Sequence, residues 1–251
     1  MDQQIRAAAA LIKASHNTVV VTGAGISTEA GIPDFRGANG IYRKIGEDKA
    51  MSVINIGFFN RDPATFYDFY REYFSFPDIK PAKAHYILAE MEKQGRIKAI
   101  VTQNVDNLHQ LAGSRRVIAV HGSGGQFECQ ERLCREVVPA EQVDLFNGDP
   151  VPLCPVCGGV LKPDVVLFGE SIKDYGPALD TILKAKLIIV IGSSLTVHPL
   201  AGFVASFNSF TQDLMIINKG RTALDHAAQL KIDVDNTGEL LEKINAAIDR
   251  M

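Results

Sequence analysis

Short apolar segments alternate with helical patterns along this chain and leave few folds open to it. Most of these segments are rich in β-branched residues and nearly continuous, which is typical of strands buried on both faces of a sheet. The expected strands are residues 18–21, 98–102, 117–120, 187–191, 214–217 and 231–234. Apolar residues recur at helical spacing in residues 5–14, 84–93, 105–112, 200–207 and 238–250. The alternation predicts an α/β fold, in which helices cover both faces of a parallel sheet.

Two stretches break this alternation and predict a smaller lobe inserted into the α/β core. Residues 37–82 are rich in aromatic residues, proline and aspartate and lack a strand pattern, so we expect a helical insertion. Residues 124–163 contain all four cysteines and much proline and glycine. The larger domain would then consist of residues 1–36, 83–123 and 164–251.

Composition and charge exclude several classes of protein. The chain has 251 residues, 46% of them hydrophobic and 22% charged, which is ordinary for a globular protein and unlike a disordered or fibrous one. A formal net charge of −3 argues against nucleic acid or an anionic membrane surface as the main partner. No apolar run reaches the roughly 18 residues that a membrane span needs, and the polar start does not resemble a signal peptide. We therefore expect a cytoplasmic location.

A glycine-rich turn follows the first expected strand. Gly23 and Gly25 would let backbone amides come close to a pyrophosphate, which the start of a following helix also favours. The common dinucleotide-binding pattern has a third glycine where this chain has Thr28. A tight turn without a ligand is therefore an equally good explanation of this motif by itself.

An acid, an aromatic ring and a base follow this turn directly. Asp34, Phe35 and Arg36 lie side by side in residues 31–37. Such a cluster could form a lid that stacks on a ring and pairs with a charge. The alternative is a surface turn that carries an incidental ion pair.

Small or polar residues follow most of the expected strands at the sheet edge where α/β proteins bind ligands. A histidine at such an edge, followed by glycine, suits a general base, although a lone histidine is more often structural. So many polar strand ends at one edge predict a binding crevice. The residues concerned are Gln103, Asn104, Val105, Asp106, His121, Gly192, Ser193, Ser194 and Asn218.

The four cysteines form two closely spaced pairs. Cys129 and Cys134 have four residues between them, Cys154 and Cys157 have two, and 19 residues separate the pairs. Two such pairs suit a tetrahedral zinc site, and four thiolates leave no open position for water. We therefore expect one structural zinc ion. Buried free thiols or a redox-active pair are the alternatives.

Taken together, these motifs resemble those of the sirtuins, the NAD-dependent protein lysine deacylases, and in particular the bacterial type. They occur in the family's order and extend from residue 18 to about residue 240. The resemblance rests on residues 23–27, 31–36, 103–106, 121–122, 168–170 and 192–194, on Asn218 and on the four cysteines. It implies a Rossmann-type domain and a small zinc-binding lobe, between which NAD and an acyl-lysine peptide meet.

The resemblance also implies roles for individual residues. It implies that the cofactor-binding residues of the first loop are Gly23, Ala24, Gly25, Thr28, Asp34, Phe35 and Arg36. The nicotinamide and its ribose would contact Gln103, Asn104, Val105, Asp106 and His121, and the adenosine half would contact Gly192, Ser193, Ser194, Asn218 and Thr237. The peptide would contact Val166, Phe168 and Gly169.

The implied reaction is lysine deacetylation, with nicotinamide and O-acetyl-ADP-ribose as products. In it Asn104 and His121 would be catalytic, and His121 would accept a proton from a ribose hydroxyl. ADP-ribosyl transfer to protein, removal of succinyl or other acyl groups, and an inactive NAD-sensing scaffold are the alternatives. A scaffold would not need Asn104, Asp106 and His121 together, and a nucleic-acid-binding zinc ribbon fits poorly with the glutamates around the first cysteine pair.

The acyl group is expected to be uncharged. In the family that this chain resembles, the sirtuins that remove succinyl groups share a Tyr-x-x-Arg motif. This chain has Tyr70 followed by Tyr73 at the position of the arginine. A buried carboxylate without a cationic partner costs several kcal/mol. Arg71 is one residue away from Tyr70 and should face elsewhere on a helix. The expected partner is therefore an acetyl-lysine protein or peptide.

Overall fold

The computed structural model describes residues 1–37 and 39–251, and its largest element is a parallel sheet of six strands. Its strands match the six that the sequence predicts. In spatial order they are β3 (Val117–Ala119), β2 (Ala99–Thr102), β1 (Thr18–Thr22), β7 (Leu187–Ile191), β8 (Asp213–Ile217) and β9 (Leu230–Ile232). The strand order reverses between β1 and β7, which is where sheets of this kind open a crevice for ligands.

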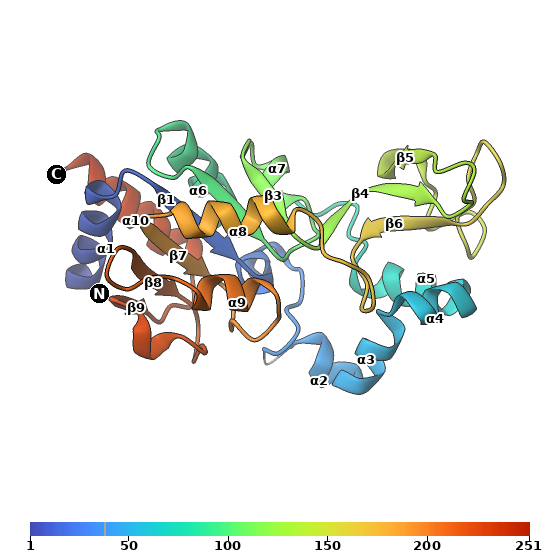
Figure 1. Cartoon of the computed structure of the whole chain (residues 1–251), viewed down its shortest axis with the longest axis horizontal. Coiled ribbons are helices and arrows are strands. Elements are labelled where there is room, and N and C mark those ends of the chain that lie inside the picture. The colour runs from blue at the N-terminus through green and yellow to red at the C-terminus, as the bar shows by residue number, and fades with distance from the viewer. Residues whose placement is uncertain (38) are drawn as a thin grey trace.

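Helices cover both faces of this sheet (Figure 1). The helices α1 (Asp2–Ala14), α6 (Lys83–Lys93) and α10 (Thr237–Asp249) pack on one face, and α8 (Tyr175–Lys184) and α9 (Leu200–Ala205) pack on the other. Side chains of β1 alternate between the two layers: Val20 lies in the first hydrophobic core, whereas Val19 and Val21 lie in the second. Burial on both faces explains why the strand has no polar alternation.

Two helices differ from the sequence expectation. The helix expected over residues 105–112 is the single turn α7 (Leu108–Leu111). Asn107 has a left-handed backbone with φ 60°, and the Asp106 carboxylate accepts a hydrogen bond from the Leu108 amide at 3.0 Å, so the preceding residues cannot be helical. Helix α8 was not among the expected helices.

The smaller lobe combines two insertions that are far apart in the sequence. The first contains α2 (Ile41–Ile45), α3 (Glu47–Val53), α4 (Ile56–Arg61) and α5 (Pro63–Tyr73), and the second contains a three-stranded antiparallel sheet. This sheet has the order β5 (Val137–Pro139), β4 (Gly122–Cys129) and β6 (Leu161–Val165). Short 3-10 helices occur in both parts of the molecule. η1 (Ala24–Ala30) follows β1 and η3 (Asp225–Ala227) precedes β9 of the large sheet, whereas η2 (Ala140–Gln142) follows β5 of the smaller one.

One hydrophobic core joins the two insertions. Phe66 and Tyr67 of α5 pack with Phe127 of β4 and Leu161 of β6. In Figure 1, α3 to α5 and β4 to β6 lie together at the end of the molecule opposite the two termini. The exact domain boundaries stay a prediction, and the predicted range 37–82 includes residue 38, which lies outside the described residues. Among the helices that the structure describes, none is long and apolar enough to cross a membrane.

Candidate active site

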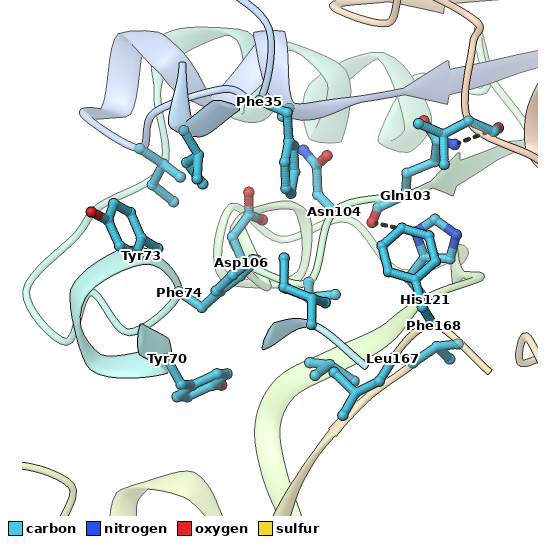
Figure 2. Close-up of a pocket in the computed structure, with 18 of the residues that line it drawn as sticks. Phe35, Tyr70, Tyr73, Phe74, Gln103, Asn104, Asp106, His121, Leu167 and Phe168 are labelled. Carbon is cyan, nitrogen blue, oxygen red and sulfur yellow. Dashed lines mark hydrogen bonds between the residues drawn. The ribbon is translucent and has the colours of Figure 1, made fainter. Parts of the chain in front are cut away.

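A cavity of about 290 Å³ lies where the carboxyl ends of β1 and β2 meet the smaller lobe. One side of it is polar and the other is built from aromatic and aliphatic side chains of the helical insertion (Figure 2). Of the predicted site residues, the structure brings ten to the cavity wall. They are Ala24, Phe35, Gln103, Asn104, Val105, Asp106, His121, Val166, Phe168 and Gly169.

The glycine-rich turn packs against the end of β7. The amides of Gly23 and Gly25 donate hydrogen bonds to the carbonyls of Ile191 and Gly192, at 3.1 and 2.9 Å. A Cβ atom at Gly23 or Gly25 would lie 2.8 Å from the Gly192 carbonyl oxygen. These two amides are therefore used within the protein, and the glycines are needed for close approach of the backbone. That they contact the cofactor stays a prediction.

Ser27 lies at the centre of the polar wall, and sequence reasoning assigned it no role. Its hydroxyl donates to the Asp106 carboxylate at 2.6 Å and accepts from the Asn104 amide at 3.3 Å. The Asn104 amide also donates to the Gly23 carbonyl at 3.2 Å. Ser27 thus fixes the two side chains predicted to bind the nicotinamide riboside. Its place inside the glycine-rich motif was the only signal in the sequence.

Two buried histidines lie behind this wall, and neither was predicted as a site residue. The rings of His85 and His109 are 4.8 Å apart, and His109 Nε2 is 2.9 Å from the Thr22 hydroxyl. Burial, and next the neighbouring His85, lower the pKa of His109 to about 3. Burial likewise lowers the pKa of His85. Both rings are therefore neutral in the folded protein and serve as uncharged packing and hydrogen-bonding groups.

His121 has the geometry of a general base. Its Nδ1 lies 3.2 Å from the Gln103 carbonyl oxygen (Figure 2). Because a carbonyl only accepts hydrogen bonds, Nδ1 carries the proton and Nε2 keeps its lone pair. Burial lowers the pKa of His121, and the hydrogen bond to the Gln103 carbonyl opposes part of this shift. The ring is thus neutral near pH 7 and able to accept a proton.

The predicted lid cluster divides into two parts. The Phe35 ring lines the cavity and packs against Tyr42 and Phe74, with ring centroids 5.4 and 6.2 Å away. Arg36 instead forms an ion pair with Glu47 at 2.9 Å. Asp34 accepts a hydrogen bond from the Gly37 amide within its own turn. Of the three, only Phe35 lines the cavity in this structure, so cofactor contacts by the other two stay predictions.

The residues predicted for the adenosine half lie outside this cavity. Gly192 and Ser193 follow β7, and Gly192 contacts the glycine-rich turn directly. The Ser194 hydroxyl is hydrogen-bonded to that of Thr196, and Asn218 bonds to the carbonyl of the next residue. The predicted contacts Thr28 and Thr237 likewise do not line it. The Thr28 hydroxyl donates to the Gly25 carbonyl, and the Thr237 amide donates to the Glu29 carboxylate.

Segment 166–169 forms the wall opposite the glycine-rich turn. The Val166 amide donates to the backbone carbonyl of His121 at 2.8 Å. Phe168 forms an isolated parallel bridge to the helical insertion, where its amide donates to the Ile54 carbonyl at 2.9 Å. Segment 166–169 therefore joins His121 to the smaller lobe.

The aromatic end of the cavity contains Tyr70 and Tyr73, but Arg71 does not line it. The Arg71 guanidinium lies over the Tyr67 ring, 5.8 Å from its centroid, and pairs with Asp68 at 3.1 Å. It also donates to the carbonyl of Leu145. This agrees with the expectation that Arg71 faces elsewhere than Tyr70.

The four cysteines converge within the smaller lobe. The sulfur atoms of Cys129, Cys134, Cys154 and Cys157 all lie within 4.8 Å of one another. Neighbouring sulfurs are 3.4 and 3.8 Å apart. A zinc ion bound tetrahedrally at about 2.3 Å separates its sulfur ligands by about 3.8 Å, so this set fits such an ion.

Comparison with known proteins places these features in a family. A sequence model of the Sir2 family matches residues 23–199. The chain is 40% identical to the NAD-dependent protein deacetylase of Clostridium perfringens, across 97% of this chain and 99% of that protein. It is 41% identical to the NAD-dependent protein deacetylase of Thermotoga maritima, across 90% of this chain and 91% of that protein.

Solved Sir2 structures share the fold. One that contains a deacetylated peptide and 3′-O-acetyl ADP ribose has a TM-score of 0.87 at 39% identity, and covers 95% of this chain and 96% of its own. One with bound acetylated peptide has a TM-score of 0.80 at 36% identity, with 96% and 95% covered. The predicted architecture, a Rossmann-type sheet with a smaller lobe, is confirmed.

Burial of His109 makes the stability of the folded protein depend on pH. Its pKa of about 3 in the folded state lies below the value of about 6.5 in an unfolded chain, so the unfolded chain binds the proton first. The stability that comes from the neutral ring is complete above pH 6.5 and is lost as the pH falls toward 3. His109→Gln keeps a donor toward Thr22 but removes the group that titrates. We expect the unfolding free energy of this variant to fall less steeply between pH 6.5 and 4.5 than that of the wild type, with a slope smaller by up to about 1.4 kcal/mol per pH unit.

Urea denaturation at several pH values measures this slope. The matched control is His16→Gln, because the His16 side chain is exposed, and this control should keep the wild-type slope. A His109→Gln protein with an unchanged slope would show that burial of this ring does not govern the acid sensitivity.

Proposed function

The chain belongs to the Sir2 family and is an NAD-dependent protein deacetylase, and we propose that His121 is the general base of its reaction. One observation carries this proposal. The Gln103 carbonyl holds the His121 ring in the tautomer that leaves Nε2 free, at the wall of the same cavity as Asn104 and Asp106. When NAD is bound, it supplies the ADP-ribose that accepts the acetyl group. The Nε2 atom of His121 would then accept a proton from a ribose hydroxyl.

The polar wall supports the predicted placement of the nicotinamide riboside. The Asp106 carboxylate is held by the Ser27 hydroxyl and by the Leu108 amide, so it is oriented before any ligand arrives. A fixed carboxylate can accept a hydrogen bond from the carboxamide of nicotinamide. Asn104, held by Gly23 and Ser27, is placed to bind a ribose hydroxyl or a water molecule. The Phe35 ring would exclude water from this end of the cavity.

Segment 166–169 is suited to bind the peptide backbone. Within the described part of the chain, no hydrogen bond reaches the Val166 carbonyl or the Gly169 amide. An extended peptide can add to such free backbone groups as a further strand. The acetyl-lysine side chain would then enter the cavity beside Phe168 and His121. This supports the prediction that Val166, Phe168 and Gly169 contact the substrate.

We also propose that the four cysteines hold one structural zinc ion. The spacing of their sulfurs fits tetrahedral coordination, and the Gly159 amide lies 3.4 Å from the Cys157 sulfur as a hydrogen-bond donor. Four thiolate ligands leave no place for substrate or water. The metal would therefore stabilise the sheet of the smaller lobe without taking part in the reaction.

The products of one reaction test the function. The protein is incubated with NAD and an acetyl-lysine peptide, and mass spectrometry should find deacetylated peptide, nicotinamide and O-acetyl-ADP-ribose in equal amounts. Free acetate without consumption of NAD would overturn the proposal. ADP-ribosylated protein as the main product would favour the alternative transferase activity.

Replacing His121 tests its role. We expect His121→Ala to lower kcat for deacetylation by at least about a hundredfold, because general base catalysis contributes roughly 10²- to 10⁴-fold. NAD binding, measured by calorimetry, should persist, since the other predicted NAD contacts remain. His16→Ala is the control for loss of an exposed histidine. Retention of most of the turnover in His121→Ala would exclude the general-base role.

Metal analysis tests the zinc site. We expect one zinc ion per chain, and we expect Cys157→Ser to lose the metal together with several kcal/mol of stability, because binding of a structural zinc ion is coupled to folding. Val156→Ser, in the same loop but without a ligand atom, should keep the metal. A metal-free preparation with full activity and unchanged melting temperature would contradict this assignment.

The aromatic acyl pocket predicts a preference for uncharged acyl groups. A succinyl carboxylate would be buried beside Tyr70 and Tyr73, and a neutral hydroxyl compensates a charge less well than a guanidinium does. We expect kcat/KM for an acetyl-lysine peptide to exceed that for a succinyl-lysine peptide by at least about tenfold, which corresponds to about 1.4 kcal/mol. Tyr73→Arg should narrow this ratio.

Both peptides are measured at the same NAD concentration. Arg71→Met is the matched control, because Arg71 faces away from the cavity, and it should leave the ratio unchanged. Equal rates for both peptides in the wild type, or a ratio that depends on Arg71, would show that another cation reaches the acyl group.

A further inference from the structure

We propose that the buried Lys162, through its ion pair with the half-buried Glu170, positions segment 166–169 for binding of the peptide substrate. This inference rests on the proposed function, in which that segment binds the peptide backbone. Neither residue touches the reacting atoms in the proposed mechanism, so both would be positioning residues.

The two charged groups hold both ends of the bend that forms the cavity wall. The Lys162 ammonium lies 3.0 Å from the Glu170 carboxylate and donates to the Val165 carbonyl at 2.7 Å. The same carboxylate oxygen accepts a hydrogen bond from the Leu167 amide at 2.8 Å. The bend is closed by the Glu170 amide, which donates to the Leu167 carbonyl at 3.0 Å. Both charges thus act on the backbone that flanks Val166.

The burial of the lysine makes a purely stabilising role a poor explanation. Only 7% of Lys162 is exposed, although it lies in β6 beside apolar strand residues. Removing a charge from water is costly, and replacing a buried ion pair with apolar residues is often neutral or stabilising. The presence of such a pair is better explained if it holds the neighbouring backbone in one particular conformation. Here that conformation is the one of the cavity wall.

No competing charge is available to Lys162 from the neighbouring strand within the described chain. Its partner in the β4–β6 register is Glu128, and Glu128 forms an ion pair with Arg135. Nearby Asp164 is paired with Lys173. Glu170 is therefore the acidic partner of Lys162 among the described residues. Glu170 is also one of the residues that line the cavity, which places one end of the pair at the proposed peptide site.

The ion pair is also connected to the general base. Lys162 holds the Val165 carbonyl, and the next amide, that of Val166, donates to the His121 carbonyl. On its other side, Phe168 is bonded to Ile54 and Ile56 of the helical insertion. The free groups of the segment, the Val166 carbonyl and the Gly169 amide, are thereby held in fixed places. In Figure 2, Leu167 and Phe168 lie on the same side of the cavity as His121.

This arrangement predicts a selective defect. Without the ion pair the segment keeps its backbone hydrogen bonds to His121 and the helical insertion but is less ordered before peptide binds, and the cost of completing that order weakens peptide binding. We expect Lys162→Met to raise KM for an acetyl-lysine peptide by about five- to twentyfold, with kcat and KM for NAD changed by less than about twofold. Lys162→Arg keeps the charge and should restore most of the peptide affinity.

Variants that remove both charges keep the test valid if single variants fold poorly. In Lys162→Met combined with Glu170→Gln, no unpaired charge is buried, and the side-chain amide oxygen introduced at position 170 can still accept from the Leu167 amide. This double variant should keep the melting temperature and zinc content of the wild type while showing the same rise in peptide KM. Lys173→Met is the matched control, because its pair with Asp164 is exposed on the lysine side.

Binding of a fluorescein-labelled acetyl-lysine peptide, followed by anisotropy, gives a readout that does not need turnover. The inference is supported if peptide affinity falls in the double variant and recovers in Lys162→Arg. It is overturned if peptide affinity is unchanged, if the wild type binds no peptide, or if melting temperature, kcat and KM for NAD decline together. A different result would contradict the proposed function: the wild type would bind the peptide but would not deacetylate it when NAD is present.

Discussion

Close contact between the backbones of β1 and β7 determines where the rest of the site lies. At the sheet's reversal point the turn after β1 rests directly on Gly192, which itself has a left-handed backbone with φ 62°. A Cβ atom at Gly192 would clash with the Ile26 amide nitrogen, so three glycines are needed to bring the segments together. This contact places Ser27 against Asn104 and Asp106, and the Gly23 carbonyl accepts from both the Ile26 amide and Asn104.

The two sides of the cavity rely on different physical effects. The polar side is fixed by hydrogen bonds among strand ends, and its histidines are neutral because burial disfavours their charged forms. The other side depends on aromatic packing, such as the stacking of Tyr70 on Phe74 with ring centroids 6.0 Å apart. An enzyme that moves an uncharged acyl group can use both: directed polar contacts for the nucleotide, and a dry pocket for the acyl chain.

The sequence predicted the sheet well because a buried parallel strand is a continuous apolar run, and six such runs are easy to find. It also predicted that Gln103, Asn104, Asp106 and His121 lie at one cavity, because polar residues at the ends of parallel strands meet at one edge. It could not reveal the His85–His109 contact or the Lys162–Glu170 pair. Each joins residues whose proximity depends on packing, and a lysine within a strand ordinarily indicates a solvent-exposed position.

The shared core of the smaller lobe has a consequence for synthesis of the chain. Tyr67 in the helical insertion donates a hydrogen bond to the Leu161 carbonyl, 94 residues further along. Because a chain emerges from the ribosome amino end first, the aromatic residues of α5 are exposed long before β4 and β6 exist to cover them. The cysteines also belong to the later segment. The nascent helical insertion therefore exposes an uncovered apolar surface, and with it a risk of aggregation, until β4 and β6 have been synthesised.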